Sequence, residues 1–190
     1  MVWGTASTST PATTATELIS KASTTHSIVV LPFRKFGDPE LIALCEKLAA
    51  APSITEIQAS GKKLGADGAN ALGALLGSGK CALRKLAAGD SAFAECGGLG
   101  GLLHGLTTAA NPCPLQTLDL GLKGFDGARD GATLQALLSC CDSLRELDLS
   151  RNPKLGAGVS SVAASGSLLH GLTRLDLSET GLDGAALFDL

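Results

Sequence analysis

The sequence predicts an α/β solenoid in which short parallel strands alternate with helices. The first observation is a leucine pattern, L-x-x-L-x-L, whose copies begin at Ile54, Leu83, Leu115, Leu144 and Leu172. The second is a stretch of helical periodicity after the motifs, and the third is the tripeptide DGA, which recurs close to the starts of those stretches. Self-similarity of this kind is typical of proteins built from stacked strand–loop–helix units.

Each leucine motif is expected to form a short strand, because its apolar and polar residues alternate. In the copy that begins at Leu115, Leu118 and Leu120 lie on one side of the strand and Asp119 lies on the other. A weaker copy, IVVLPF, begins at Ile28. With this copy included, the sequence predicts about six repeats.

The stretches between the motifs favour helices that bury one face. Residues Asp38–Ala50 open with Asp and Pro, which suit the first positions of a helix, and continue with apolar residues at helical spacing. Asp67–Leu76 and Asp130–Cys140 repeat this pattern, and each opens with DGA. An Asp at such a position can accept hydrogen bonds from free N–H groups of the first turn.

This unit resembles the leucine-rich repeats of the ribonuclease-inhibitor-like family, as in NOD-like receptor repeat regions and Ran GTPase-activating proteins. The resemblance covers residues 28–190 and implies a horseshoe-shaped solenoid, with a parallel β-sheet on the concave face and helices on the convex face. The family's Asn at position nine is kept only as Asn152, and the other copies carry Lys62, Ser91, Lys123 and Thr180. We therefore expect most turns after the strands to be bonded differently.

The two ends of the chain are expected to differ from the repeats. Residues 1–25 are rich in Ser, Thr and Ala and are expected to form a flexible arm, with a short helical stretch at Glu17–Ser23. Residues 26–190 are expected to form the solenoid. Its last repeat is expected to be incomplete and uncapped, which favours self-association. The arm lacks the features of a secretory signal, so a cytoplasmic location is expected, with organelle targeting by the Ser/Thr-rich N-terminus as the alternative.

Composition argues against several classes of protein. With 45% hydrophobic and 17% charged residues the chain is not expected to be disordered, and a net charge of −3 does not fit nucleic-acid binding. No membrane span is expected, because no apolar run reaches about 18 residues. The cysteines show neither C-x-x-C spacing nor a zinc-ligand pattern, so free thiols and no metal are expected. They are Cys45, Cys81, Cys96, Cys113, Cys140 and Cys141.

Two stretches resemble parts of reactive or ligand-binding sites, but neither has the sequence context that such a site needs. Ala74–Cys81 resembles a phosphate-binding loop, but Cys81 replaces the metal-binding hydroxyl and a helix, not a strand, comes before it. The hexapeptide LLHGLT occurs twice, which places His104 in the last turn of a helix and His170 in a helix-to-strand loop. We expect no catalytic, cofactor or metal site, and we expect that the protein is not an enzyme.

The candidate site is the concave face, where equivalent positions of neighbouring strands form columns. The fifth-position column reads Gln58, Ala87, Asp119, Asp148, Asp176, and the third-position column reads Glu56, Lys85, Thr117, Glu146, Arg174. Two interpretations of the acids stay open: solvated repeat positions, or a site for a basic protein partner. The candidate binding residues are Asp119, Glu146, Asp148, Arg174 and Asp176.

These features favour a non-catalytic protein–protein interaction module or scaffold that binds a protein on the concave face or its rim. Two alternatives remain at this point. The resemblance to Ran GTPase-activating proteins implies a regulator of a small GTPase. The other alternative is a fragment of a larger receptor or axonemal protein.

Overall fold

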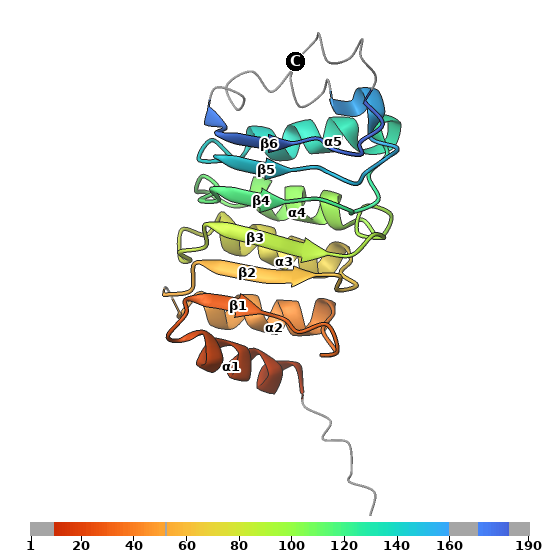
Figure 1. Ribbon diagram of the computed structural model, residues 1–190. Helices are drawn as coiled ribbons and strands as arrows, with labels where there is room; N and C mark the ends of the chain where they lie inside the picture. Colours follow the sequence, from red (N-terminus) through yellow and green to blue (C-terminus); the bar gives the residue numbers. More distant parts are fainter. Residues whose placement is uncertain (1–9, 52, 160–170, 183–190) are drawn as a thin grey trace, which may run out of the picture.

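The computed structural model describes residues 10–51, 53–159 and 171–182. Within these ranges six strands form one parallel sheet, and their order in the sheet is their order in the chain (Figure 1). The strands are β1 (Ser27–Val29), β2 (Glu56–Ser60), β3 (Lys85–Gly89), β4 (Thr117–Asp119), β5 (Glu146–Asp148) and β6 (Arg174–Asp176). The predicted parallel α/β arrangement is thus confirmed, with one strand for each copy of the motif.

Helices alternate with the strands and cover one face of the sheet (Figure 1). They are α1 (Pro11–Ala22), α2 (Asp38–Leu48), α3 (Ala66–Leu76), α4 (Gly98–Thr107), α5 (Gly127–Ser139) and the short 3₁₀ helix η1 (Gly156–Gly158). The helix expected at Asp130 begins three residues earlier, because Asp126 caps it by accepting hydrogen bonds from the N–H groups of Ala128 and Arg129. We call the other face, which no described helix covers, the open face.

The core lies between the sheet and the helices. Residues at the fourth position of the motif are paired in register from strand to strand, so their side chains form one buried row: Ile28, Ile57, Leu86, Leu118 and Leu147. Leucines of the helices, such as Leu41 and Leu72, pack against this row. Each such side chain stabilises the fold by about 1.5–3 kcal/mol through removal from water.

The first repeat has a different register from the predicted one. The sequence aligns Ile28 with the first position of the motif, but the strand pairing sets Ile28 opposite Ile57, which holds the fourth position. Ile28 and Val30 are buried, whereas Val29 between them is 49% exposed. Val29 therefore takes the fifth position on the open face, and the residues that follow Val30 form a loop.

The N-terminal segment also differs from the expected flexible arm. Thr10 caps a helix through its side-chain oxygen, Pro11 occupies the first turn, and α1 continues to Ala22. Its face of Ala15, Leu18 and Ala22 is 0–5% exposed and packs on α2 and β1. From Pro11 onward this segment therefore covers the first edge of the stack, while residues 1–9 lie outside the described ranges.

Glycines bring α3 and α4 unusually close together. A Cβ atom on Gly105 would overlap the carbonyl oxygen of Asn70, and one on Gly101 would overlap that of Ala66. On the facing helix, a Cβ on Gly73 would overlap the carbonyl oxygen of Leu102. Each glycine lowers the stability of the helix by up to about 1 kcal/mol relative to alanine. The absence of side chains at these positions allows the two helix backbones to touch directly.

Three further expectations from the sequence concern the cysteines, a membrane span and the C-terminal repeat. All six cysteines are free thiols. None of the helices in the described ranges combines the length and apolar composition that a membrane span needs. The last repeat is described as far as residue 182, and its end, residues 183–190, on which the expectation of an uncapped helix falls, lies outside the described ranges, as does His170.

Candidate protein-binding surface

The strand register arranges the predicted columns on the open face. In the fifth-position column, Gln58, Ala87, Asp119, Asp148 and Asp176 are paired from one strand to the next, and Val29 precedes them. Neighbouring strands in a sheet lie about 4.8 Å apart, so each of these residues has its equivalent as an immediate neighbour. The column changes from uncharged to acidic between β3 and β4.

The three aspartates of the column each close a turn. Their Oδ1 atoms accept hydrogen bonds from the backbone N–H two residues later: from Gly121 at 2.9 Å, from Ser150 at 2.8 Å and from Ser178 at 3.0 Å. Within the described residues the second oxygen of each carboxylate, Oδ2, has no hydrogen-bond partner. One oxygen therefore serves the fold, and the other is available to a ligand.

The arginines near these aspartates do not pair with them. Arg145 donates instead to the carbonyl oxygens of Leu144, at 3.0 Å, and Gly171, at 3.3 Å. Between described residues, the ion pairs are Arg34–Glu17 and Arg129–Asp130, and neither involves the column. Among the residues that the structure describes, none forms an ion pair with this row of carboxylates.

A buried cation lies beneath the acidic residues. Lys123 is only 3% exposed, and its Nζ donates to the carbonyl oxygen of Gly121 at 2.8 Å. Burial lowers the pKa of Lys123, and the nearby carboxylates of Asp119 and Asp148 oppose that shift. Lys123 therefore offsets part of the acidic charge from below.

Asp176 retains its charge to lower pH than a free aspartate. The hydroxyl and the backbone N–H of Ser178 both donate to its Oδ1, and these hydrogen bonds lower the pKa of Asp176. The positive charges of Arg174 and Arg151 act in the same direction with a smaller effect. The last residue of the column is thus an anion over the whole physiological pH range.

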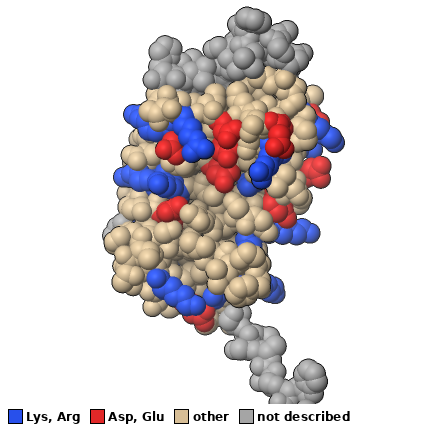
Figure 2. All heavy atoms as spheres, viewed as in Figure 1, with Lys and Arg blue, Asp and Glu red and all other residues tan. Residues whose placement is uncertain are grey.

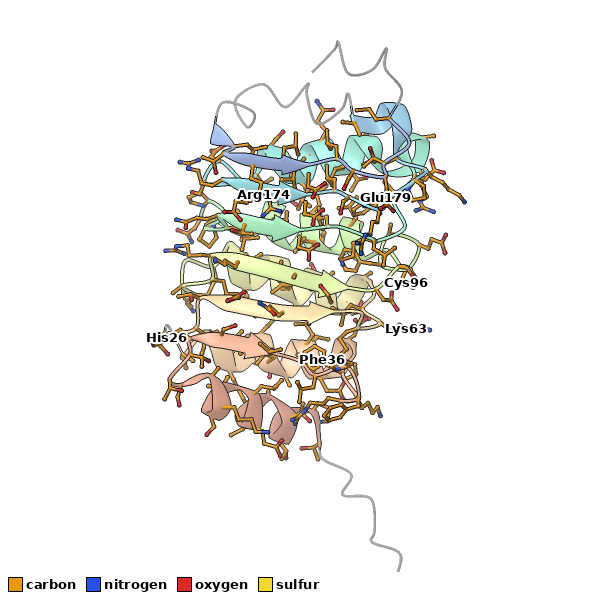
Figure 3. The ribbon with its side chains drawn as sticks, viewed as in Figure 1. His26, Phe36, Lys63, Cys96, Arg174 and Glu179 are labelled. Atoms are coloured by element: carbon orange, nitrogen blue, oxygen red, sulfur yellow. The ribbon has the colours of Figure 1, made fainter. Side chains whose placement is uncertain are left out.

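Two hollows bring the predicted residues together. A small one of about 130 Å³ is lined by Asp119, Glu146, Asp148 and Arg174, and Glu146 also accepts a 3.5 Å hydrogen bond from the hydroxyl of Thr117. A larger one of about 550 Å³ follows the carboxyl ends of the strands and is lined by Asp119, Asp148 and Asp176. Figure 3 labels Arg174 on β6 and Glu179 beyond the ends of the strands.

Sequence reasoning missed an apolar hollow on the other half of the open face. It measures about 480 Å³ and lies over β1 to β4. Val29, Pro32, Ile57 and Ala87 supply its apolar surface, and the charged residues Glu56, Lys85 and Asp119 also line it. In Figure 2 the charged side chains gather over the upper half of the face, and the lower half is mostly uncharged. The signal in the sequence was IVVLPF, which has too many apolar residues in succession for a strand with one solvated face.

The structure also places His104 and the segment that resembles a phosphate-binding loop. His104 is exposed in the last turn of α4, as the sequence predicts. The segment that resembles a phosphate-binding loop follows α3 and precedes β3, so it does not open a helix. In the described ranges, no three His, Cys, Asp or Glu side chains group closely enough to hold a metal ion.

No protein-family model matches this chain, and no curated protein matches it either. The open face carries a defined set of chemical groups on residues of the strands and of the turns after them. These residues offer carboxylate oxygens, an arginine and an apolar hollow on one continuous face. Such groups are suited to the recognition of another chain.

Proposed function

We propose that this protein is a leucine-rich repeat protein of the ribonuclease-inhibitor-like class that acts as a non-catalytic interaction module. It binds a protein partner with exposed Lys or Arg on the open face, which is the concave face of that repeat class. The observation that carries the proposal is the row of Asp119, Asp148 and Asp176, whose Oδ2 atoms have no described hydrogen-bond partner.

Membership of the repeat class is supported by Asn152. Its buried side chain accepts hydrogen bonds from the N–H groups of Lys123 and Phe125 and donates to three carbonyl oxygens. This is the backbone bonding in the turn after the strand that the resemblance implies for position nine. The strand–loop–helix order of the described repeats points the same way.

Binding through the acidic row is supported by the balance of charges on the outer side of the column. A lysine or arginine of a partner would meet carboxylate oxygens that need no rearrangement, because their turns already fix them. Complementary charge of this kind mainly raises the rate of association, and salt weakens it.

The test is binding of a fluorescein-labelled lysine-rich peptide, followed by anisotropy at low and moderate salt. The double variant Asp148→Asn/Asp176→Asn removes two charges, and its amide oxygens can still close the turns. We expect affinity to fall about fivefold at low salt and less at moderate salt. A glutamate-rich peptide of equal length serves as the negative probe.

The matched control is Asp67→Asn/Asp142→Asn, which removes the same number of charges at exposed positions outside the hollows. We expect this control to bind the lysine-rich peptide as the unmodified protein does. Equal affinities in all three proteins would rule out the acidic row as the site.

A further inference from the structure

Exposed apolar side chains are concentrated in one short segment. Val29, Leu31 and Phe33 are 49%, 47% and 87% exposed, and Leu122 is the only other large apolar side chain among the described residues with comparable exposure. Val29 ends β1, and Leu31 and Phe33 belong to the loop after it. Water contact with this much apolar surface is unfavourable, which favours its burial by a partner.

The loop that carries Phe33 is held in place from two sides. The ammonium group of Lys62, which is 5% exposed, donates three hydrogen bonds to this loop. The acceptors are the carbonyl oxygens of Leu31, Pro32 and Arg34, at 2.7, 2.9 and 2.8 Å. On the other side, the guanidinium of Arg34 pairs with Glu17 of α1 at 2.6 Å. Phe33 is thus presented by a preorganised backbone, which lowers the entropy cost of binding.

The apolar hollow is continuous with the acidic row. Asp119 lines the 480 Å³ hollow together with Val29 and Ala87, and it also lines both acidic hollows. From Ala87 to Asp148 the column crosses two strand spacings, about 10 Å, which an extended chain covers in about three residues. A single short segment can therefore reach from one half of the face to the other.

We propose that the apolar hollow receives an aromatic or aliphatic side chain of a partner segment whose Lys or Arg residues contact Asp119, Asp148 and Asp176. This proposal rests on the function proposed above and adds the chemistry of the partner: an apolar anchor about three residues from its basic residues. Val29 and Pro32, from the segment that carries the exposed apolar side chains, line the hollow and contact the anchor.

Charge complementarity favours such a segment over a second copy of this chain. Two copies docked face to face would bring together two columns of three aspartates each, and the paired columns of each copy offer only Lys85 and Arg174 as cations. A basic segment with an apolar anchor satisfies both halves of the face at once.

The test uses a phage-displayed library of random peptides, selected on the immobilised protein. We expect the enriched peptides to combine a large apolar residue with Lys or Arg at the stated spacing. On the Val29→Ser/Ala87→Ser variant, which changes two residues that line the apolar hollow, selection should keep the basic residues and lose the apolar one. The consensus peptide, made synthetically, should bind this variant about tenfold more weakly.

Leu122→Asn is the matched control, because Leu122 is 51% exposed and lines an acidic hollow but not the apolar one. Its selected peptides should keep the apolar anchor. Basic peptides without an apolar position would overturn the inference and leave the proposed function standing. Apolar peptides without basic residues would contradict the proposed function instead. A dimer in sedimentation that Phe33→Ser dissociates would identify a second copy as the occupant and overturn the inference.

Discussion

The amide oxygen of Asn152 accepts a hydrogen bond from the backbone N–H of Lys123, 3.0 Å away and one repeat earlier in the chain. The same oxygen also accepts from the N–H of Phe125, and its amide nitrogen donates to Leu120, Leu149 and Ser150. A single side chain thus joins the turns of two neighbouring repeats.

Replacing Asn152 with Ala should destabilise the protein by about 3 kcal/mol, because two buried N–H groups would lose their acceptor. Chemical denaturation followed by circular dichroism measures this loss. Asn111→Ala is the control, since Asn111 is exposed and donates only to the carbonyl of Gly77. A loss as small as that of the control would mean that water takes over the role of the Asn152 side chain.

Gly105→Ala should cost about 2 kcal/mol, because the added methyl group would overlap the backbone of α3 at Asn70. Gly100→Ala, in the same helix, should instead stabilise by about 0.5–1 kcal/mol, since no neighbouring atom lies within 4 Å of its would-be Cβ. Thermal unfolding of both variants gives the comparison. Equal shifts of the same sign would show that α3 and α4 do not touch through these glycines.

Leu18→Ala should weaken the docking of α1 by about 2–3 kcal/mol, because Leu18 is the largest buried side chain of that helix. Trypsin cleavage after Lys21 reports on this docking, and we expect it to be slow in the unmodified protein and fast in the variant. Thr16→Ala, on the exposed face, should leave the rate unchanged. Rapid cleavage of the unmodified protein would show instead that the N-terminal segment is the flexible arm expected from the sequence.

Cys96 is exposed and should react with a thiol reagent at once in the native protein. Cys45 should remain unmodified until the protein unfolds, because burial shields it and raises its pKa to about 12. Mass spectrometry of labelled peptides separates the two sites, and labelling in denaturant is the control. Since all six thiols are free, melting curves with and without reductant should coincide; a drop on reduction would reveal a disulfide.

Ser178→Ala should raise the pKa of Asp176 toward its ordinary value of 3.8, because the hydroxyl that donates to this carboxylate is removed. A lowered carboxyl pKa in the folded state adds stability above the unfolded pKa, and this stability is lost as the pH falls through the folded pKa. The variant should therefore lose less stability on acidification. Carboxyl chemical shifts in an NMR titration measure the change, and Ser139→Ala, in α5, is the control.

The sequence predicted the strands and the columns because a repeat fixes both. Once Leu118 and Leu147 hold equivalent positions, the alternation of a strand sends Asp119 and Asp148 to the opposite face in the same register. The role of Asn152 followed from the same alignment. These features depend only on the spacing of residues along the chain, which can be read directly from the sequence.

Other features depend on contacts within the protein that the spacing of residues in the sequence does not reveal. Ile28, Val29 and Val30 are all β-branched and apolar, so the alternation between buried and exposed positions is invisible in their letters. Gly105 favours no particular neighbour, and its contact with α3 follows only from the packing of two helices. The signal for α1 was present, in Thr10 followed by Pro11.

The close approach of α3 and α4 has a consequence for the shape of the binding face. Neighbouring strands lie about 4.8 Å apart and packed helices usually about 8–10 Å, so a stack of strand–helix units bends toward its strands. Where glycines let two helices approach more closely, this mismatch shrinks. The two helices belong to the units that begin with β2 and β3, so curvature should be weakest between these two strands, where Gln58 is paired with Ala87. The flattest step of the sheet therefore lies within the apolar hollow, whose lining includes both Gln58 and Ala87.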